Sequence, residues 1–390
     1  MLRIIVGIMR LLFSLFSNGK PKDRIALLSR QGSTMPIDYQ LLIDRIEATH
    51  PGIEIVSCLT NYASDGLFGY SRKMIRQIKL AATSRVIVVN GYVQAVCVPK
   101  DMSGHEVIQI WHALGAIKKF GLSSLGTEAG RTEKQASVGC MHKNYDCIIA
   151  GGPGATEAYC KSFGYGPEAI VALGMPRIDG IRALGIDGTP EREEALAKVR
   201  EHLDLGDGRF NVLYAPTMRQ DAATDAWLSD SISKLASRCP ADSMNLLVSG
   251  HPLTKSDGSE AASSGNVIIS SEVKSLEMLT VSDCVITDYS AIAFEAWLAG
   301  VPVFFYVPDI ESYRKSPGLF IDPLIEFPSR SSADADVLMD AVLAFAQGGG
   351  ADDPFSAFCE SYFAGVGDDV TGDVVEFIVG RLGAKAGDRL

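Results

Sequence analysis

Four short motifs each place polar side chains directly after an apolar, strand-like run. The first motif follows Val107–Ile110 and contains His112. An imidazole with a pKa near ~6.5 can accept a proton from a hydroxyl group at neutral pH. We therefore interpret His112 as a general base. The alternative is a hydrogen-bonded structural histidine packed beside Trp111.

The second and third motifs add groups suited to phosphate. Thr217 and Arg219 extend beyond the strand-like run Asn211–Ala215, and His251 follows the run Leu246–Ser249. A guanidinium group there can bind a phosphate through two parallel hydrogen bonds. For either Arg219 or His251 taken alone, an ordinary ion pair or a capped loop is an alternative explanation. Together they favour a phosphate site.

The fourth motif joins the strand-like run Cys284–Thr287 to the helical pattern Ala291–Leu298. Asp288 or Ser290 is expected to cap this helix. The exposed amide groups and the helix dipole would then receive a diphosphate, with Ser290 donating to it. Glu295 is placed to hold a ribose hydroxyl. The alternative is a capped strand–helix crossover without a ligand, since capping alone explains Asp and Ser.

The segments between these motifs alternate strand-like and helix-like patterns, which predicts parallel βαβ units. We expect an α/β, GT-B-like fold: two doubly wound, Rossmann-like domains facing across a cleft, followed by C-terminal helices. Ligands of such sheets bind at the carboxyl ends of the strands, where the four motifs lie. The expected limits are a basic amphipathic helix at 1–20, an acceptor-side domain at 21–188, a donor-binding domain at 189–330 and C-terminal helices at 331–390.

Composition excludes several classes of protein. Of the 390 residues, 47% are hydrophobic and 21% charged, as in folded globular proteins, and the net charge of −11 argues against a nucleic-acid partner. The eight cysteines form no C-x-x-C pair and are expected to be reduced thiols of a cytosolic chain. No cluster of Asp, Glu or His stands out as a Mg²⁺ site, so we expect neither an obligatory metal nor a cofactor.

The N-terminus departs from this acidic character. Residues 2–16 are almost wholly apolar, interrupted by Arg3 and Arg10, and are shorter than the ~20 residues that span a bilayer. A short basic amphipathic helix here favours in-plane attachment to an anionic membrane surface. A first core helix and a self-association helix remain alternatives. A signal peptide is not expected, because Ser14–Asn18 lacks a suitable cleavage site.

Taken together, the motifs resemble the CDP-glycerol glycerophosphotransferase family, which includes teichoic acid primases and polymerases. Their order and spacing agree over about residues 105–325. The resemblance is carried by Trp111-His112 with Lys118-Lys119-x-Gly121, Gly174-x-Pro176-Arg177-x-Asp179, Tyr214-Ala215-Pro216-Thr217-x-Arg219, His251-Pro252 and Thr287-Asp288-Tyr289-Ser290.

The resemblance implies a GT-B-type fold in which the C-terminal domain holds a CDP-polyol donor and the N-terminal domain receives the acceptor. It also implies peripheral attachment at the cytoplasmic face of the membrane. The catalytic candidates are then His112, Arg219 and His251. The candidates for substrate binding are Trp111, Gly115, Lys118, Pro176, Arg177, Thr217, Asp288, Tyr289, Ser290 and Glu295.

The chain departs from the family pattern at two places. The family reads Trp-His-Gly-Thr-Pro where this chain has Ala113-Leu114-Gly115 after His112, and Ala291 replaces a usual second serine. Both changes lie where substrate would contact the protein, so the acceptor and the polyol stay open.

The expected reaction moves glycerol phosphate or ribitol phosphate from its CDP ester to a hydroxyl of a glycan or lipid-linked acceptor, with release of CMP. Such a reaction would build a teichoic acid-like or capsular polymer. The enzymatic alternative is a GT-B glycosyltransferase that uses a nucleotide sugar. A non-catalytic scaffold is a further alternative, although His112, Arg219 and His251 together argue against it. A homo-oligomer is possible on this sequence.

Overall fold

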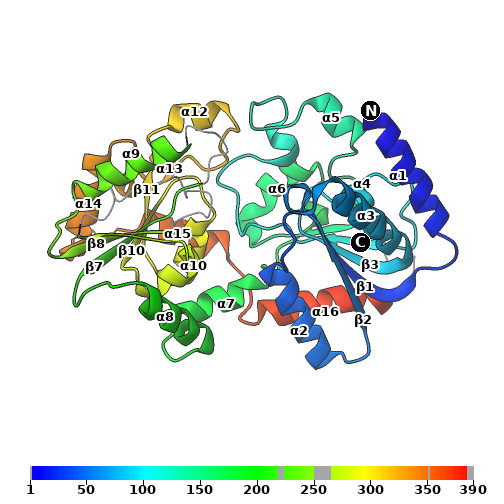
Figure 1. The fold of residues 1–390 in the computed structure, drawn as a ribbon, viewed down its shortest axis with the longest axis horizontal. Coiled ribbons are helices and arrows are strands. Elements are labelled where there is room, and N and C mark those ends of the chain that lie inside the picture. The colour runs from blue at the N-terminus through cyan, green and yellow to red at the C-terminus, as the bar shows by residue number, and fades with distance from the viewer. Residues whose placement is uncertain (1, 218–223, 250–264, 350–351, 384–390) are drawn as a thin grey trace. The chain divides into compact units, whose positions relative to one another are not determined.

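The computed structural model describes residues 2–217, 224–249, 265–349 and 352–383 (Figure 1). The chain forms two compact units. The first comprises Met1–Asp179, Lys315–Gly318 and Tyr362–Leu390, and the second comprises Gly180–Arg314 and Leu319–Ser361. The last helix therefore belongs to the first unit. The domain limits expected from the sequence remain a prediction, which this division into two units does not test.

The first unit is built on a six-stranded parallel sheet with the order β2-β1-β3-β4-β5-β6 in the described part of the chain. The last six residues of β1 and the last four of β3 are all buried, which explains their uninterrupted apolar runs, because helices cover both faces of such a sheet. The strands are β1 Lys22–Ser29, β2 Glu54–Leu59, β3 Ser84–Val89, β4 Glu106–Gln109, β5 Cys147–Ile149 and β6 Ile170–Val171.

Helices surround this first sheet. In Figure 1, α1 lies along α3, and α16 lies along α2, in agreement with the contacts between these elements. The helix α3 is kinked at Gly66, which has a φ of 63°. The helices of this unit are α1 Leu2–Phe16, α2 Ile37–Thr49, α3 Tyr62–Thr83, α4 Gln94–Cys97, α5 Glu133–Val138, α6 Thr156–Phe163 and α16 Val370–Gly383; α7, Arg177–Leu184, continues into the second unit.

The second unit has its own six-stranded parallel sheet, ordered β12-β11-β10-β7-β8-β9 among the described residues. Residues of β7, β8, β10 and β11 form a buried apolar core with α9 and α14. The strands are β7 Phe210–Tyr214, β8 Met244–Ser249, β9 Val267–Ser270, β10 Cys284–Thr287, β11 Val303–Tyr306 and β12 Ser331–Ser332. Two parallel sheets in one chain confirm the α/β class expected from the alternating patterns.

The helices of the second unit connect these strands. Short helices prevail around β10, whereas longer ones flank β7 and follow β12. They are α8 Pro190–His202, α9 Thr224–Ala236, α10 Ser275–Met278, α11 Ile292–Leu298, α12 Ile310–Lys315, α13 Pro323–Glu326, α14 Ala335–Ala346 and α15 Pro354–Tyr362.

Two ion pairs, one buried and one exposed, join α2 to Arg177 and to the residue before α16. Asp38, on α2, is 1% exposed and accepts hydrogen bonds from the backbone N and the Nε of Arg177, at 3.0 Å each. Two residues after Arg177, the carboxylate of Asp179 accepts hydrogen bonds from the backbone amides of Val370 and Thr371 at the start of α16. By contrast, Arg45 of α2 pairs with Asp369 at the surface.

We predict that Asp38→Ala lowers the free energy of unfolding by about 3 kcal/mol, because it removes the buried carboxylate that pairs with the largely buried Arg177 guanidinium. The matched control is Arg45→Ala, which removes the exposed pair on the same helix and is expected to cost less than about 1 kcal/mol. Denaturant unfolding of both variants measures the difference. Equal losses would show that burial does not set the contribution of the Asp38 pair.

Candidate functional site

The carboxyl edge of the first sheet has one position where the direction of strand addition reverses. The chain adds β2 on one side of β1 and then β3 on the other, so the connections leave β1 and β3 in opposite directions. Such a reversal is where open α/β sheets bind ligands. The segments that meet here are Arg30-Gln31 after β1, Asn90-Gly91 after β3 and Trp111-His112 after β4.

His112 is held at this edge by its Nδ1 atom. Nδ1 lies 3.1 Å from the backbone oxygen of Asn90 and 3.3 Å from Nε2 of Gln31. Because a carbonyl oxygen only accepts, the contact with Asn90 requires a proton on Nδ1, which leaves Nε2 unprotonated in the neutral ring. The amide nitrogen of Gln31 is itself a donor, so it then lies near Nδ1 without a hydrogen bond to it. An unprotonated Nε2 with a fixed ring orientation is the arrangement that a general base needs.

The surroundings keep the imidazole neutral. Burial lowers the pKa of His112 from its ordinary value of 6.5 to about 4; the Asn90 carbonyl opposes this shift, and the positive charge of Arg177 adds to it. Asp38 raises this pKa and Lys118 lowers it, so both charges are felt at the ring. At neutral pH the ring is therefore uncharged and can take up a proton.

Trp111 supports the ring next to it. Its backbone has a φ of 54°, the left-handed region that a bulky side chain rarely adopts. The indole lies 4.0 Å from the His112 ring and stacks on Phe120 at 4.6 Å, measured between ring centres. The indole thus packs against the imidazole and limits the orientations open to it. Gly115 is buried in the same connection, and Lys118 is partly buried.

Two other candidates of the first unit have partners within the protein. Arg177 pairs with the buried Asp38, and the backbone oxygen of Pro176 accepts from the hydroxyl of Thr371 at 3.2 Å. The motif around them therefore fastens α16 to the sheet. The charge of Arg177 also lowers the pKa of His112.

The second sheet has the same kind of reversal between β7 and β10. Asp288, which follows β10, is fully buried, and its Oδ1 accepts from the backbone amides of Thr217 at 2.8 Å and Tyr289 at 2.5 Å. The hydroxyl of Thr287 donates to the backbone oxygen of Ala215. These bonds fix the loops that follow β7 and β10 to one another.

Asp288 does not cap α11, because it is turned to the neighbouring loop instead. The formal N-cap of the helix is Ala291, which has no side-chain cap. Ser290, the other expected cap, accepts a long hydrogen bond of 3.5 Å from the amide of Ile292, the first residue of α11. The sequence places Asp288 correctly at the strand end, but its partner Thr217 is 71 residues away and could not be read from local spacing.

Ser290 and Glu295 line a pocket of about 370 Å³ at this edge, together with Ala215 and Pro216. Lys274 and Ser275, at the start of α10, line it too and were not among the sequence candidates. Tyr289 instead lies in the core, stacked on Tyr313 at 3.8 Å, with its hydroxyl donating to Asp309. The pocket offers a lysine, hydroxyl groups and a carboxylate, which suit a phosphorylated nucleoside.

Two of the catalytic candidates, Arg219 and His251, lie outside the described residues. Sequence reasoning also missed Arg30, Gln31, Asn90 and Asp38 in the first unit. Arg30, Gln31 and Asn90 directly follow or end apolar strand-like runs, so the rule that found His112 would have found them. Within the described ranges, no group of three or more His, Cys, Asp or Glu side chains is arranged to hold a metal ion.

Comparisons with known proteins agree with this architecture. The chain is 26% identical to the teichoic acid glycerol-phosphate primase of Bacillus subtilis (strain 168) over 270 residues, which is 69% of this chain and 68% of the relative. It is 26% identical to the teichoic acid ribitol-phosphate primase of Bacillus spizizenii over 327 residues, 80% of each chain. The solved structure of the wall teichoic acid polymerase TagF matches with a TM-score of 0.70 at 19% identity, covering 97% of this chain and 95% of that one.

The structural likeness confirms the GT-B class of fold. The family described as CDP-glycerol:poly(glycerophosphate) glycerophosphotransferase matches residues 10–379, which is nearly the whole chain. The matched range contains the reversals of strand order in both sheets. The resemblance predicted from the motifs is thereby confirmed, and the chain belongs to the CDP-glycerol:poly(glycerophosphate) glycerophosphotransferase family.

Proposed function

We propose that this chain transfers a polyol phosphate, as glycerol phosphate or ribitol phosphate, from a CDP-polyol to an acceptor hydroxyl in teichoic acid-type polymer synthesis. The acceptor is a glycan or lipid-linked saccharide. Family membership supports the reaction class. The observation that carries the chemistry is the neutral His112 ring, fixed through Nδ1 so that Nε2 is available as a base.

In the proposed reaction, the acceptor oxygen attacks the β-phosphorus of the donor while His112 Nε2 takes the hydroxyl proton. The new P–O bond forms as the bond to the bridging oxygen breaks, and CMP leaves with that oxygen. Positioning and charge neutralisation contribute most of the rate enhancement of such a transfer. We propose that Arg219 and His251, with the pocket that Ser290 and Glu295 line, hold the donor diphosphate.

The proposal predicts that His112→Ala lowers kcat for CMP release from CDP-glycerol or CDP-ribitol by about 10²–10⁴-fold, the range expected when a general base is lost. The assay follows CMP in the presence of a membrane fraction that supplies acceptor. His50→Gln is the control, since it removes a histidine of the same unit that lies away from the sheet edge. A folded His112→Ala protein with near wild-type turnover would exclude the base role.

The identity of the released nucleotide separates the proposal from its enzymatic alternative. A glycosyltransferase that uses a nucleotide sugar commonly releases a nucleoside diphosphate, whereas polyol-phosphate transfer releases CMP. Release of a nucleoside diphosphate from a sugar donor, with no CMP from either CDP-polyol, would favour the alternative.

We further propose that α1 attaches the protein peripherally to the cytoplasmic face of the membrane. Val6, Met9 and Phe13 are buried on one face of this helix. The opposite face exposes a stripe of large apolar side chains, each 44–68% exposed: Ile4, Ile5, Ile8, Leu11 and Leu15. In the described part of the chain, no helix has the length and apolar character to cross a bilayer. A helix apolar on both faces, with one face covered by protein, suits in-plane binding.

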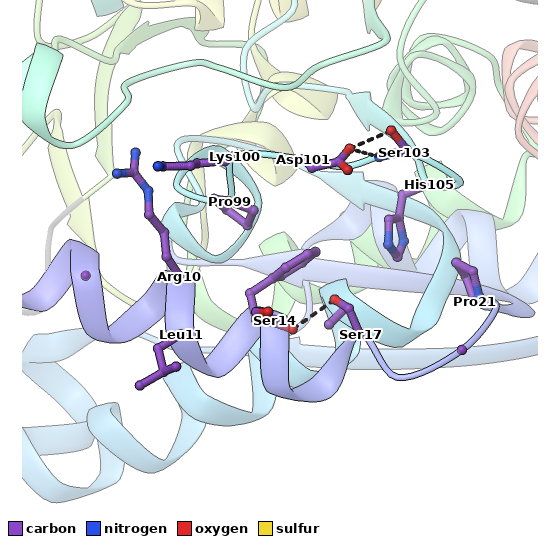
Figure 2. A pocket seen from close by; sticks show the side chains of 14 residues that line it. Arg10, Leu11, Ser14, Ser17, Pro21, Pro99, Lys100, Asp101, Ser103 and His105 are labelled. Atoms are coloured by element: carbon purple, nitrogen blue, oxygen red, sulfur yellow. Dashed lines mark hydrogen bonds between the residues drawn. The ribbon is translucent and has the colours of Figure 1, made fainter.

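Basic groups border this helix. Figure 2 shows the pocket of about 700 Å³ beside α1, into which Arg10 and Lys100 project from different elements. Arg10 also donates to the backbone oxygen of Val98, so its charge is fixed against the protein. Lys100 is exposed and so is available to anionic lipid, which attracts each Lys or Arg near its surface by about 1 kcal/mol.

We predict that Ile8→Glu reduces binding to phosphatidylglycerol-containing vesicles by at least ~10-fold, because it removes an inserted apolar side chain and adds a repelled charge. Vesicle co-sedimentation measures the effect. Ile325→Glu, on α13 of the second unit, makes the same change at a comparably exposed isoleucine and should leave binding unchanged. Equal binding by wild type and Ile8→Glu would contradict this role for α1.

A further inference from the structure

Arg30 follows β1 at the reversal of the first sheet and has only neutral partners. One terminal nitrogen donates to the backbone oxygen of Tyr92 at 3.4 Å, and the other donates to the hydroxyl of Tyr70. The centre of the guanidinium lies 5.5 Å from the centre of the Tyr70 ring. Its Nε is buried and has no hydrogen-bond partner. Among the described residues, no carboxylate forms an ion pair with Arg30.

Asp65, at the start of α3, has partners of its own. Asp65 accepts from Lys73 at 2.7 Å and from the hydroxyl of Thr60, and these bonds lower the pKa of Asp65 to about 2. A second guanidinium, that of Arg131, lies over the ring of Tyr92 at 5.5 Å. Asp65 therefore does not balance the charge of Arg30, although a partly buried guanidinium without a counter-charge is costly.

The geometry ties Arg30 to the base. Gln31, the next residue, brings its Nε2 to 3.3 Å from Nδ1 of His112. Tyr92, which accepts from Arg30, follows two residues after Asn90, which accepts from His112. A Cβ built at Gly91 would lie 2.7 Å from the side-chain amide of Gln31, so the Gln31 side chain packs directly over this glycine. Arg30 and His112 thus share the same pair of loops.

A guanidinium group binds phosphate oxygens through parallel N–H donors, and Arg30 keeps unused donors on both terminal nitrogens. We propose that Arg30 binds a phosphate ester of the acceptor, so that the preferred acceptor ends in a polyol phosphate whose hydroxyl reaches His112. The inference rests on the proposed function, since it assigns the bound phosphate to the acceptor. The same chemistry could come from free phosphate or from the diphosphate of a lipid carrier.

The first experiment measures binding without turnover, by calorimetry of the full chain with sn-glycerol 3-phosphate, inorganic phosphate or glycerol. We expect sn-glycerol 3-phosphate to bind more tightly than either of the others, and Arg30→Gln to weaken it by about 10- to 100-fold, as for the loss of a charge-assisted hydrogen bond. Arg72→Gln, which removes an exposed arginine on α3, is the matched control and should bind as wild type. Equal affinity of wild type and Arg30→Gln for sn-glycerol 3-phosphate would overturn the proposal.

The second experiment compares acceptors. With an acceptor that ends in a polyol phosphate, Arg30→Gln should raise KM by about 10- to 100-fold while kcat changes little, and Arg30→Lys should restore part of the loss. With a lipid diphosphate-linked saccharide that lacks the polyol phosphate, both variants should match wild type. Equal losses on the two acceptors would overturn the assignment and indicate a structural role or a site for the carrier diphosphate.

The two experiments separate this inference from the proposed function. If no CMP is released with any acceptor while sn-glycerol 3-phosphate binding still depends on Arg30, the phosphate site stands and the proposed function fails. If CMP is released and the binding of sn-glycerol 3-phosphate does not depend on Arg30, the proposed function stands and the phosphate site at Arg30 is wrong. Near wild-type melting temperatures of Arg30→Lys would confirm that lost binding does not reflect unfolding.

Discussion

The reversal of strand order within each parallel sheet is the constraint on which both candidate sites depend. At a reversal, the connections leave two adjacent strands toward opposite faces, so the loops at their carboxyl ends separate and expose backbone groups. In the first sheet this happens between β1 and β3, and in the second between β7 and β10. Loops that follow these strands contribute Arg30, Gln31 and Asn90 to the first site and Asp288 and Ser290 to the second, and His112 joins the first site from the loop after β4.

In the first unit, burial and hydrogen bonding together set the state of the base. Burial alone would leave an imidazole neutral but free to rotate and to exchange tautomers. The bond from Nδ1 to the Asn90 oxygen settles the orientation and the tautomer, and the left-handed backbone at Trp111 holds the neighbouring indole against the ring. Arg177 contributes its charge at a distance, and it can remain beside the site because Asp38 pairs with it.

Local pattern predicted the strands and the residues at their ends, but not the long-range partners of those residues. His112 and Asp288 were found because apolar runs end directly before them. Their actual bonds, to Asn90 and to the Thr217 amide, depend on which strands become neighbours. Likewise, nothing near Arg177 indicates that its partner is Asp38, 139 residues earlier, or that α16 returns to the first unit. The capping expectation failed for Asp288 for the same reason, because its carboxylate bonds the distant Thr217 loop and not the helix that follows it.

The measurement that tests this account most directly is the ¹⁵N NMR titration of His112 in the full chain, assigned with His112→Gln. The structure predicts a neutral ring protonated at Nδ1 throughout pH 7.5–5.5, with protonation of Nε2 only near a pKa of about 4. A ring protonated at Nε2, or one that titrates near its ordinary value of 6.5, would contradict the assignment of His112 as a base poised by Asn90 and burial.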